Sequence, residues 1–221
     1  MATVFNPTLQ EIALAAVNQK VLLQGVGWDF YEQVLTEYAD SNALHFAYDN
    51  GTLEVKVPVW EHEVPSKILS HLVTHICNEL EIDVRNFGST TFRRHAKAKG
   101  CDPDGCFYIQ HEPQMRRVLE LDLRHDPPPD LVIEVDVTSP SLNKLPIYAA
   151  LGVPEIWLYR GERVTFHRLT GDTYEEMTHS LALPALDSRT ATEFLQQGLT
   201  ESSAIWFRRV RAWAAQLKDE G

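Results

Sequence analysis

The chain has 221 residues, of which 44% are hydrophobic and 23% are charged. This balance argues against disorder, and the length is sufficient for one large domain with a core of its own. The net charge of −11 and the pI near 5.2 count against a protein that grips many phosphates through a broad basic face, although a local patch or a bound cation can still hold nucleic acid.

Location and redox state follow from two further whole-chain features. The sequence contains no run of about eighteen apolar residues, and its first residues lack the basic flank and apolar block of a signal peptide. The three cysteines, Cys77, Cys101 and Cys106, are too few and odd in number for a disulfide framework. We therefore expect a cytoplasmic protein with no membrane partner, whose reduced cysteines serve packing.

The first part of the chain is expected to hold two helices and a hairpin. Residues 8–18 and 28–39 have the apolar spacing of short helices. Residues 44–58 contain Asn50 and Gly51 between two β-rich runs. Because Asn-Gly readily adopts the positive φ that tight turns need, this segment predicts two antiparallel strands.

A longer helix follows the hairpin. Residues 62–82 place apolar side chains at helical spacing, and a proline falls early enough to be tolerated in a first turn. Short strands are expected over 83–88 and 105–109, with polar and basic residues between them. We expect residues 110–129 to be a connection with some strand in it.

The next segment has the order strand, helix, strand. Residues 131–137 and 155–160 are expected strands, and residues 142–151 are an expected helix that serine opens and Gly152 closes. Such a unit can form one parallel crossover.

The C-terminal part is expected to add strands over 164–169 and 173–179 and a helix over 201–218. Together, the elements predict the mixed α/β (α+β) class, with helices flanking one central mixed sheet.

The strand over 131–137 carries carboxylates where a buried strand should have apolar side chains. Because side chains alternate along a strand, the aliphatic residues at 131, 133 and 135 point to one face, while Asp130, Glu134 and Asp136 point to the other. One alternative is that the acidic face is simply solvated. A crossover helix would cover a face, however, and clustered carboxylates need a cation or protons to offset their repulsion. The pattern therefore favours a metal site.

Glu134 needs a partner from another strand. Residues four apart in a strand lie roughly 13 Å apart, so Asp130 is too distant to share an ion with Glu134. The stretch CDPDGC places Asp104 at the start of a short strand. Neighbouring strands lie about 4.8 Å apart, close enough for two carboxylates to bracket a divalent cation. Asp102 is a competitor for the role of Asp104, and a plain tight turn is the alternative.

Positive charge is available near this strand. Phosphodiester cleavage needs it, because negative charge builds up in the transition state and the attacking water must be oriented. Lys144 lies on the first turns of the following helix, near enough to reach the end of the strand, although an ordinary surface lysine is the alternative. The basic cluster Arg93, Arg94, Lys97 and Lys99 is equally compatible with phosphate contacts and with a solvated loop.

Five segments in this order resemble the PD-(D/E)xK nuclease superfamily, and more closely its Uma-two family of bacterial restriction-endonuclease-like proteins. The matching segments are YDNGTLEVKVPVWEHE (48–63), FGSTTFRR (87–94), CDPDGCFYI (101–109), PPDLVIEVDVTSPS (128–141) and KLPIYAALGVPEIWLY (144–159). They cover most of residues 28–170.

The resemblance implies a restriction-endonuclease-like core and a magnesium-dependent nuclease site. Asp104 matches the aspartate of the motif, Glu134 matches its second acid, and Glu63 matches an acid that the superfamily often adds on the preceding helix. Two positions after Glu134 the motif has lysine, but this chain has Asp136. In related families that lysine can move to the following helix, and Lys144 fits the relocation. Asp136 is then a candidate ligand of a second metal ion.

We therefore expect an endonuclease that uses Mg²⁺ or Mn²⁺ and acts on nucleic acid, foremost DNA, and a homodimer because nuclease folds of this type often pair. We expect a single domain over 1–221, with N-terminal helices over 1–43, the core over 44–170 and a C-terminal strand and helix over 171–221. The alternative is a catalytically inactive nuclease-fold protein with a binding or regulatory role, which Asp136 at the lysine position and the acidic charge favour.

Overall fold

The computed structural model describes residues 20–38, 44–57, 60–119, 121–136 and 142–219. The helix expected over 8–18 lies outside these residues. Within them, no helix combines the length and the apolar character that crossing a bilayer requires.

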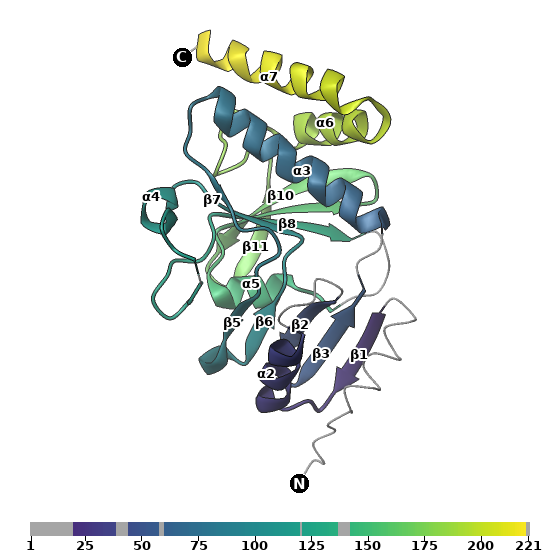
Figure 1. Cartoon of the computed structure of the whole chain (residues 1–221), viewed down its shortest axis with the longest axis vertical. Coiled ribbons are helices and arrows are strands. Elements are labelled where there is room, and N and C mark those ends of the chain that lie inside the picture. Colours follow the sequence, from purple (N-terminus) through teal and green to yellow (C-terminus); the bar gives the residue numbers. More distant parts are fainter. Residues whose placement is uncertain (1–19, 39–43, 58–59, 120, 137–141, 220–221) are drawn as a thin grey trace.

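Two sheets form the framework of the molecule (Figure 1). The first has five strands in the order β1-β3-β2-β6-β5, and all neighbouring strands in it are antiparallel. Its strands are β1 (Lys20–Gln24), β2 (His45–Asp49), β3 (Thr52–Lys56), β5 (Phe92–Arg94) and β6 (Lys99–Cys101). The predicted hairpin is confirmed as β2 and β3, with Asn50 at φ 47° and Gly51 at φ 91° in its turn.

The second sheet has six strands in the order β11-β10-β9-β8-β7-β4. Its strands are β4 (Arg85–Asn86), β7 (Gly105–Tyr108), β8 (Leu131–Asp136), β9 (Glu155–Arg160), β10 (Arg163–Thr170) and β11 (Thr173–Met177). Strands β8 and β9 are parallel and are joined through helix α5 (Leu145–Leu151), so the predicted crossover is confirmed. Gly152 ends α5 in the left-handed conformation, with φ 85°.

Helices cover both sheets (Figure 1). Helix α3 (Trp60–Glu79), α6 (Ser188–Thr200) and α7 (Ser203–Asp219) pack together over one face of the six-stranded sheet, and α2 (Trp28–Glu37) packs on the five-stranded sheet. The segment expected to contain some strand forms a short helix, α4 (Glu112–Met115), instead. Helix α6 was not predicted, although the side chain of Asp187 caps it by accepting a hydrogen bond from the amide of Thr190.

The mixed α/β class is confirmed, but the strands do not gather around one sheet. Strands β5 and β6 lie in the segment expected to be polar and basic; β6 pairs with β2 of the hairpin and β5 pairs with β6, so that these strands complete a separate five-stranded sheet. The chain crosses from one sheet to the other between Cys101 and Gly105. Helix α5 lies at this junction, where Ile147 and Tyr148 pack with residues of both sheets. Asp104 and Glu134, the two acids that the sequence analysis paired, lie at this junction.

Candidate active site

Asp104 and Glu134 lie opposite each other at one end of the pairing between β7 and β8. The antiparallel register pairs Gly105 with Ile133, and one further step places Asp104 opposite Glu134. Each of the two residues is 8% exposed. The structure thus brings together the two acids that the sequence analysis paired, and it does so through adjacent strands.

Glu134 is held by two side chains of the crossover segment. The Nζ of Lys144 donates to both carboxylate oxygens, at 3.0 and 2.9 Å, and the hydroxyl of Tyr148 donates to Oε1. Burial raises the pKa of Glu134 to about 7; the nearby charge of Asp104 adds to this rise, and Lys144 and Tyr148 oppose it. Burial thus favours the protonated form of this carboxyl group more than it is favoured in a solvent-exposed glutamate.

Lys144 remains a cation in this environment. Burial by itself would lower the pKa of its ammonium group, but the negative charges of Glu134 and Asp104 outweigh burial and raise the pKa. Its Nζ also donates to the backbone carbonyl of Asp102, at 3.1 Å. The lysine thus lies at the junction of the sheets and not on the open surface, with 14% of its side chain exposed.

Asp104 is fixed through one of its two carboxylate oxygens. The backbone amide of Val135 donates to Oδ2, at 2.7 Å. The other oxygen, Oδ1, lies 3.8 Å from Nδ1 of His45, and burial lowers the pKa of this histidine to about 4, so its ring is neutral at pH 7. Among the described residues no donor lies within hydrogen-bonding distance of Oδ1, which leaves this oxygen available to a ligand.

A second histidine lies beside the same strand. Nδ1 of His62, on the first turn of α3, is 3.0 Å from the carbonyl oxygen of Val135 and 3.0 Å from Nζ of Lys56. Burial lowers the pKa of His62, and the charge of Lys56 acts in the same direction. His62 is buried, so it belongs to the wall of the site.

The two remaining predicted site residues have partners of their own. Glu63 forms an ion pair with Lys67, at 3.8 Å, along the surface of α3. Asp136 pairs with Arg160 of β9, at 2.5 Å. Among the described residues no hydrogen bond or ion pair joins either acid to Asp104 or Glu134. Their assisting and metal-binding roles stay predictions.

Two other buried acids near the site have structural partners. Asp130 accepts hydrogen bonds from the amides of Ile109 and His111, at 2.7 and 2.9 Å. Oδ2 of Asp102 accepts a hydrogen bond from the amide of Phe46, at 2.8 Å. Burial raises the pKa of Asp102 to about 6. Its Oδ1 is buried and has no hydrogen-bond partner among the described residues.

The donor set fits a hard divalent cation. Among the described residues, no group of three or more His, Cys, Asp or Glu side chains is arranged to hold a metal ion. A zinc site needs at least three such ligands. Magnesium is instead commonly bound through one or two carboxylates, with water and substrate phosphates as the other ligands. Asp104 and Glu134 supply that pair of carboxylates.

Sequence reasoning missed Tyr148, His45 and His62. Tyr148 follows Lys144 by four positions, so the helical spacing of the two residues could have identified it. The histidines come from β2 and α3, and only the packing of these elements brings them to β8. The three cysteines are buried and free, as predicted.

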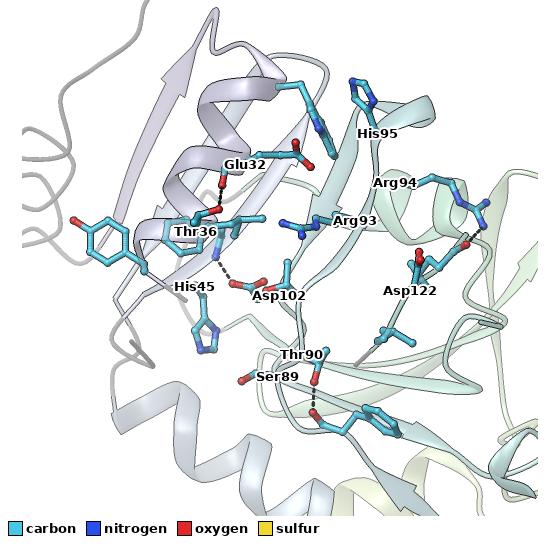
Figure 2. A pocket seen from close by; sticks show the side chains of 18 of the residues that line it. Glu32, Thr36, His45, Ser89, Thr90, Arg93, Arg94, His95, Asp102 and Asp122 are labelled. Carbon is cyan, nitrogen blue, oxygen red and sulfur yellow. Dashed lines mark hydrogen bonds between the residues drawn. The ribbon is translucent and has the colours of Figure 1, made fainter. Parts of the chain in front are cut away.

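A pocket of about 1060 Å³, lined among others by His45 and Asp102, lies next to this site (Figure 2). Helix α2 forms one side, and the segments around Arg93 and Arg94 and around Asp122 form the other. His45 and Asp102 line it as well, so it reaches the wall of the Asp104 site. Of the basic cluster, Arg93 and Arg94 therefore line a pocket, whereas Lys99 is paired with Asp49.

Comparison with known proteins identifies the family. The model of the Uma2 family, described as "Putative restriction endonuclease", matches residues 28–205. The chain belongs to the Uma2 family. The match runs from the start of α2 into α7 and includes all the predicted site residues, so the resemblance seen in the sequence is confirmed at the level of the Uma2 family.

Among solved structures, this Uma2 chain is similar to one described as a "putative nuclease belonging to DUF820" from Anabaena variabilis. The two are 17% identical, the similarity covers 68% of this chain and 90% of that chain, and the TM-score is 0.45. No curated protein sequence matches the chain.

Proposed function

We propose that this Uma2 protein is a metal-dependent endonuclease that hydrolyses phosphodiester bonds of nucleic acid, foremost DNA. The observation that carries the proposal is the pair of buried carboxylates on adjacent strands, with a protonated lysine on one of them. Membership of a family described as "Putative restriction endonuclease" supports nucleic acid as the substrate.

Asp104 and Glu134 would hold Mg²⁺ or Mn²⁺. When bound, the cation would polarise the scissile phosphate and help to generate a nucleophile from water. Both carboxylates are oriented before a cation binds, Asp104 by the amide of Val135 and Glu134 by the hydroxyl of Tyr148. Oriented ligands reduce the reorganisation that the site must undergo during the reaction.

Lys144 would stabilise the negative charge that develops on the phosphate. It takes the place of the lysine that the motif has at the position of Asp136. Because its ammonium group is largely buried, its charge is less screened than that of a surface lysine and acts more strongly on a phosphate that enters the site. Lys144 can also orient the attacking water through one of its three N–H groups.

A binding or regulatory protein without nuclease activity is the second candidate. The contact between Lys144 and both oxygens of Glu134 favours it, because this ion pair satisfies the carboxylate without a metal ion. A cation must compete with Lys144 for Glu134.

Two measurements on the same proteins test the proposal. Thermal unfolding with increasing Mg²⁺ or Mn²⁺ reports metal binding, because a ligand of the native state raises the Tm. Cleavage of plasmid, single-stranded DNA and RNA reports activity. The proteins are the wild type, Asp104→Asn, Glu134→Gln, Lys144→Ala and, as a matched acid on the surface of α6, Glu193→Gln.

We expect the wild type and Glu193→Gln to gain thermal stability with metal and to cut at least one substrate. Asp104→Asn and Glu134→Gln should lose both effects, and Lys144→Ala should lose cleavage. Binding of metal by the wild type without cleavage of any substrate would reject the nuclease in favour of the second candidate. Absence of both effects in the wild type would reject the metal site.

A further inference from the structure

The pocket beside the acids shares two residues with the wall of the proposed active site. His45 lines the pocket and lies 3.8 Å from Asp104. Asp102 also lines it, and the carbonyl group of Asp102 accepts the hydrogen bond of Lys144. A molecule that contacts His45 in the pocket is therefore one residue away from Asp104, and one that contacts Asp102 is one residue away from Lys144. With about 1060 Å³, the pocket is at the upper end of the size of ligand sites, roughly 300–1000 Å³.

Arg93 brings a positive charge into this pocket. Its side chain is exposed, and among the described residues it forms no hydrogen bond or ion pair. The neighbouring cations differ, since Arg94 donates to the carbonyl of Leu123 and Arg124 is held by Asp122. Figure 2 shows Arg93 pointing between Glu32 and Asp102 into the space beside α2. Within the described part of the chain, Arg93 is thus a cation that a phosphate or a base in the pocket can engage without displacing a partner.

Flat rings line the same pocket. Trp28 and His95 are among the lining residues, with ring centroids 5.2 Å apart and an interplanar angle of 33°, and Phe46 and Phe87 line the pocket as well. Aromatic rings next to an arginine are the combination on which proteins stack unpaired bases, because every base has a π-face.

We propose that this pocket holds one unstacked nucleotide next to the scissile phosphate, so that the substrate class is single-stranded nucleic acid. The inference rests on the proposed function, because it assigns the phosphate of that nucleotide to the Asp104 and Glu134 site. A base that is paired and stacked in a duplex can enter such a pocket only by being flipped out, which costs a few kcal/mol.

Fluorescence anisotropy without divalent cations tests the pocket separately from cleavage. The probes are a labelled single-stranded DNA, a single-stranded RNA of the same sequence and the corresponding DNA duplex. The variants are Arg93→Ala and His95→Ala, whose side chains are both exposed, and the control is Arg189→Ala, an exposed arginine on α6. Circular dichroism verifies that each variant is folded.

We expect the wild type to bind a single strand at least tenfold more tightly than the duplex. Arg93→Ala and His95→Ala should each weaken single-strand binding at least threefold, and Arg189→Ala should not. Equal affinity for single strand and duplex, or unchanged binding in both pocket variants, would overturn the inference. If the pocket variants lose binding while the wild type cuts nothing, the nuclease fails and the pocket stands. If the wild type cuts while both variants bind normally, the nuclease stands and the role of the pocket fails.

Discussion

Two buried carboxylates, Asp130 just before β8 and Glu134 within it, differ in what holds them. Asp130 and Glu134 lie four residues apart and are 4% and 8% exposed. Backbone amides of Ile109 and His111 donate to Oδ2 of Asp130, and the ring of His111 contacts its Oδ1, whereas only the side chains of Lys144 and Tyr148 donate to Glu134 among the described residues. Burial alone therefore does not separate a structural acid from a functional one.

The kind of partner makes the difference. Backbone amides are part of the fold, and a carboxylate that they hold cannot leave without exposing buried donors. Side chains can rotate away, and a carboxyl group with a pKa raised to about 7 releases its proton readily when a cation arrives. The acid held by side chains can thus exchange its partners during a reaction, and the following predictions test this contrast.

The largest effect on cleavage is expected from substitution of Glu134. Glu134→Gln keeps the shape of the side chain but removes the negative charge that would hold the cation. We expect cleavage to fall about 10²–10³-fold, as when one preorganised group of an active site is lost. Steady-state cleavage at saturating Mg²⁺ measures it, and retention of more than a tenth of the activity would contradict a ligand role.

Substitution of Asp130 should instead lower the stability of the fold. Asp130→Ala leaves the amides of Ile109 and His111 without their acceptor. A fully buried unsatisfied donor costs about 1–3 kcal/mol. Because the amide of Ile109 is buried and that of His111 only partly so, we expect a loss of about 2–4 kcal/mol in the free energy of unfolding. Urea unfolding measures this loss. An Asp130→Ala variant with the stability of the wild type but without activity would contradict a purely structural role for Asp130.

The pH dependence of metal binding sharpens the comparison. A cation binds the ionised form of Glu134, and the ionised fraction rises as the pH passes its pKa of about 7. For that pKa we expect the apparent Mg²⁺ affinity to increase about tenfold from pH 6 to pH 8. Isothermal titration at the two pH values measures it, together with the protons released. An affinity that falls with increasing pH would show that Glu134 is not a ligand.

The smallest effect is expected at Asp136, which β8 presents two positions further on. Asp136 forms an ion pair with Arg160, and 66% of the arginine side chain is exposed. Such pairs contribute less than about 1 kcal/mol, so Asp136→Asn should change stability by no more than that and cleavage by less than about threefold. A role as ligand of a second metal ion predicts a much larger loss of cleavage, and the same assay decides between the two.

Much of the site was predictable because its signals are local. Alternation along residues 131–136 predicts a strand with one acidic and one aliphatic face, and both the strand and the parallel crossover after it are present. The distance between strands predicts that the partner of Glu134 comes from another strand, and the register places Asp104 there. Local spacing also brings Lys144 to the end of the strand.

The five-stranded sheet could not be predicted in the same way. Strands β5 and β6 have three residues each, and several of these residues are basic or glycine. Strands of this kind carry little propensity of their own and form because the hairpin offers them a partner. The pocket depends on the same pairing, since Arg93 reaches it only when β5 is placed beside β6.

The sequence by itself determined the class of the fold, the strand that carries Glu134 and the family, because these depend on periodicity and on motif order along the chain. Only the tertiary structure decided which of two residues adjacent in the sequence, such as His62 and Glu63, faces the site. Consecutive residues of a helix point about 100° apart, since one turn takes 3.6 residues. The packing of α3 on β8 therefore turned His62 towards Val135 and left Glu63 with Lys67.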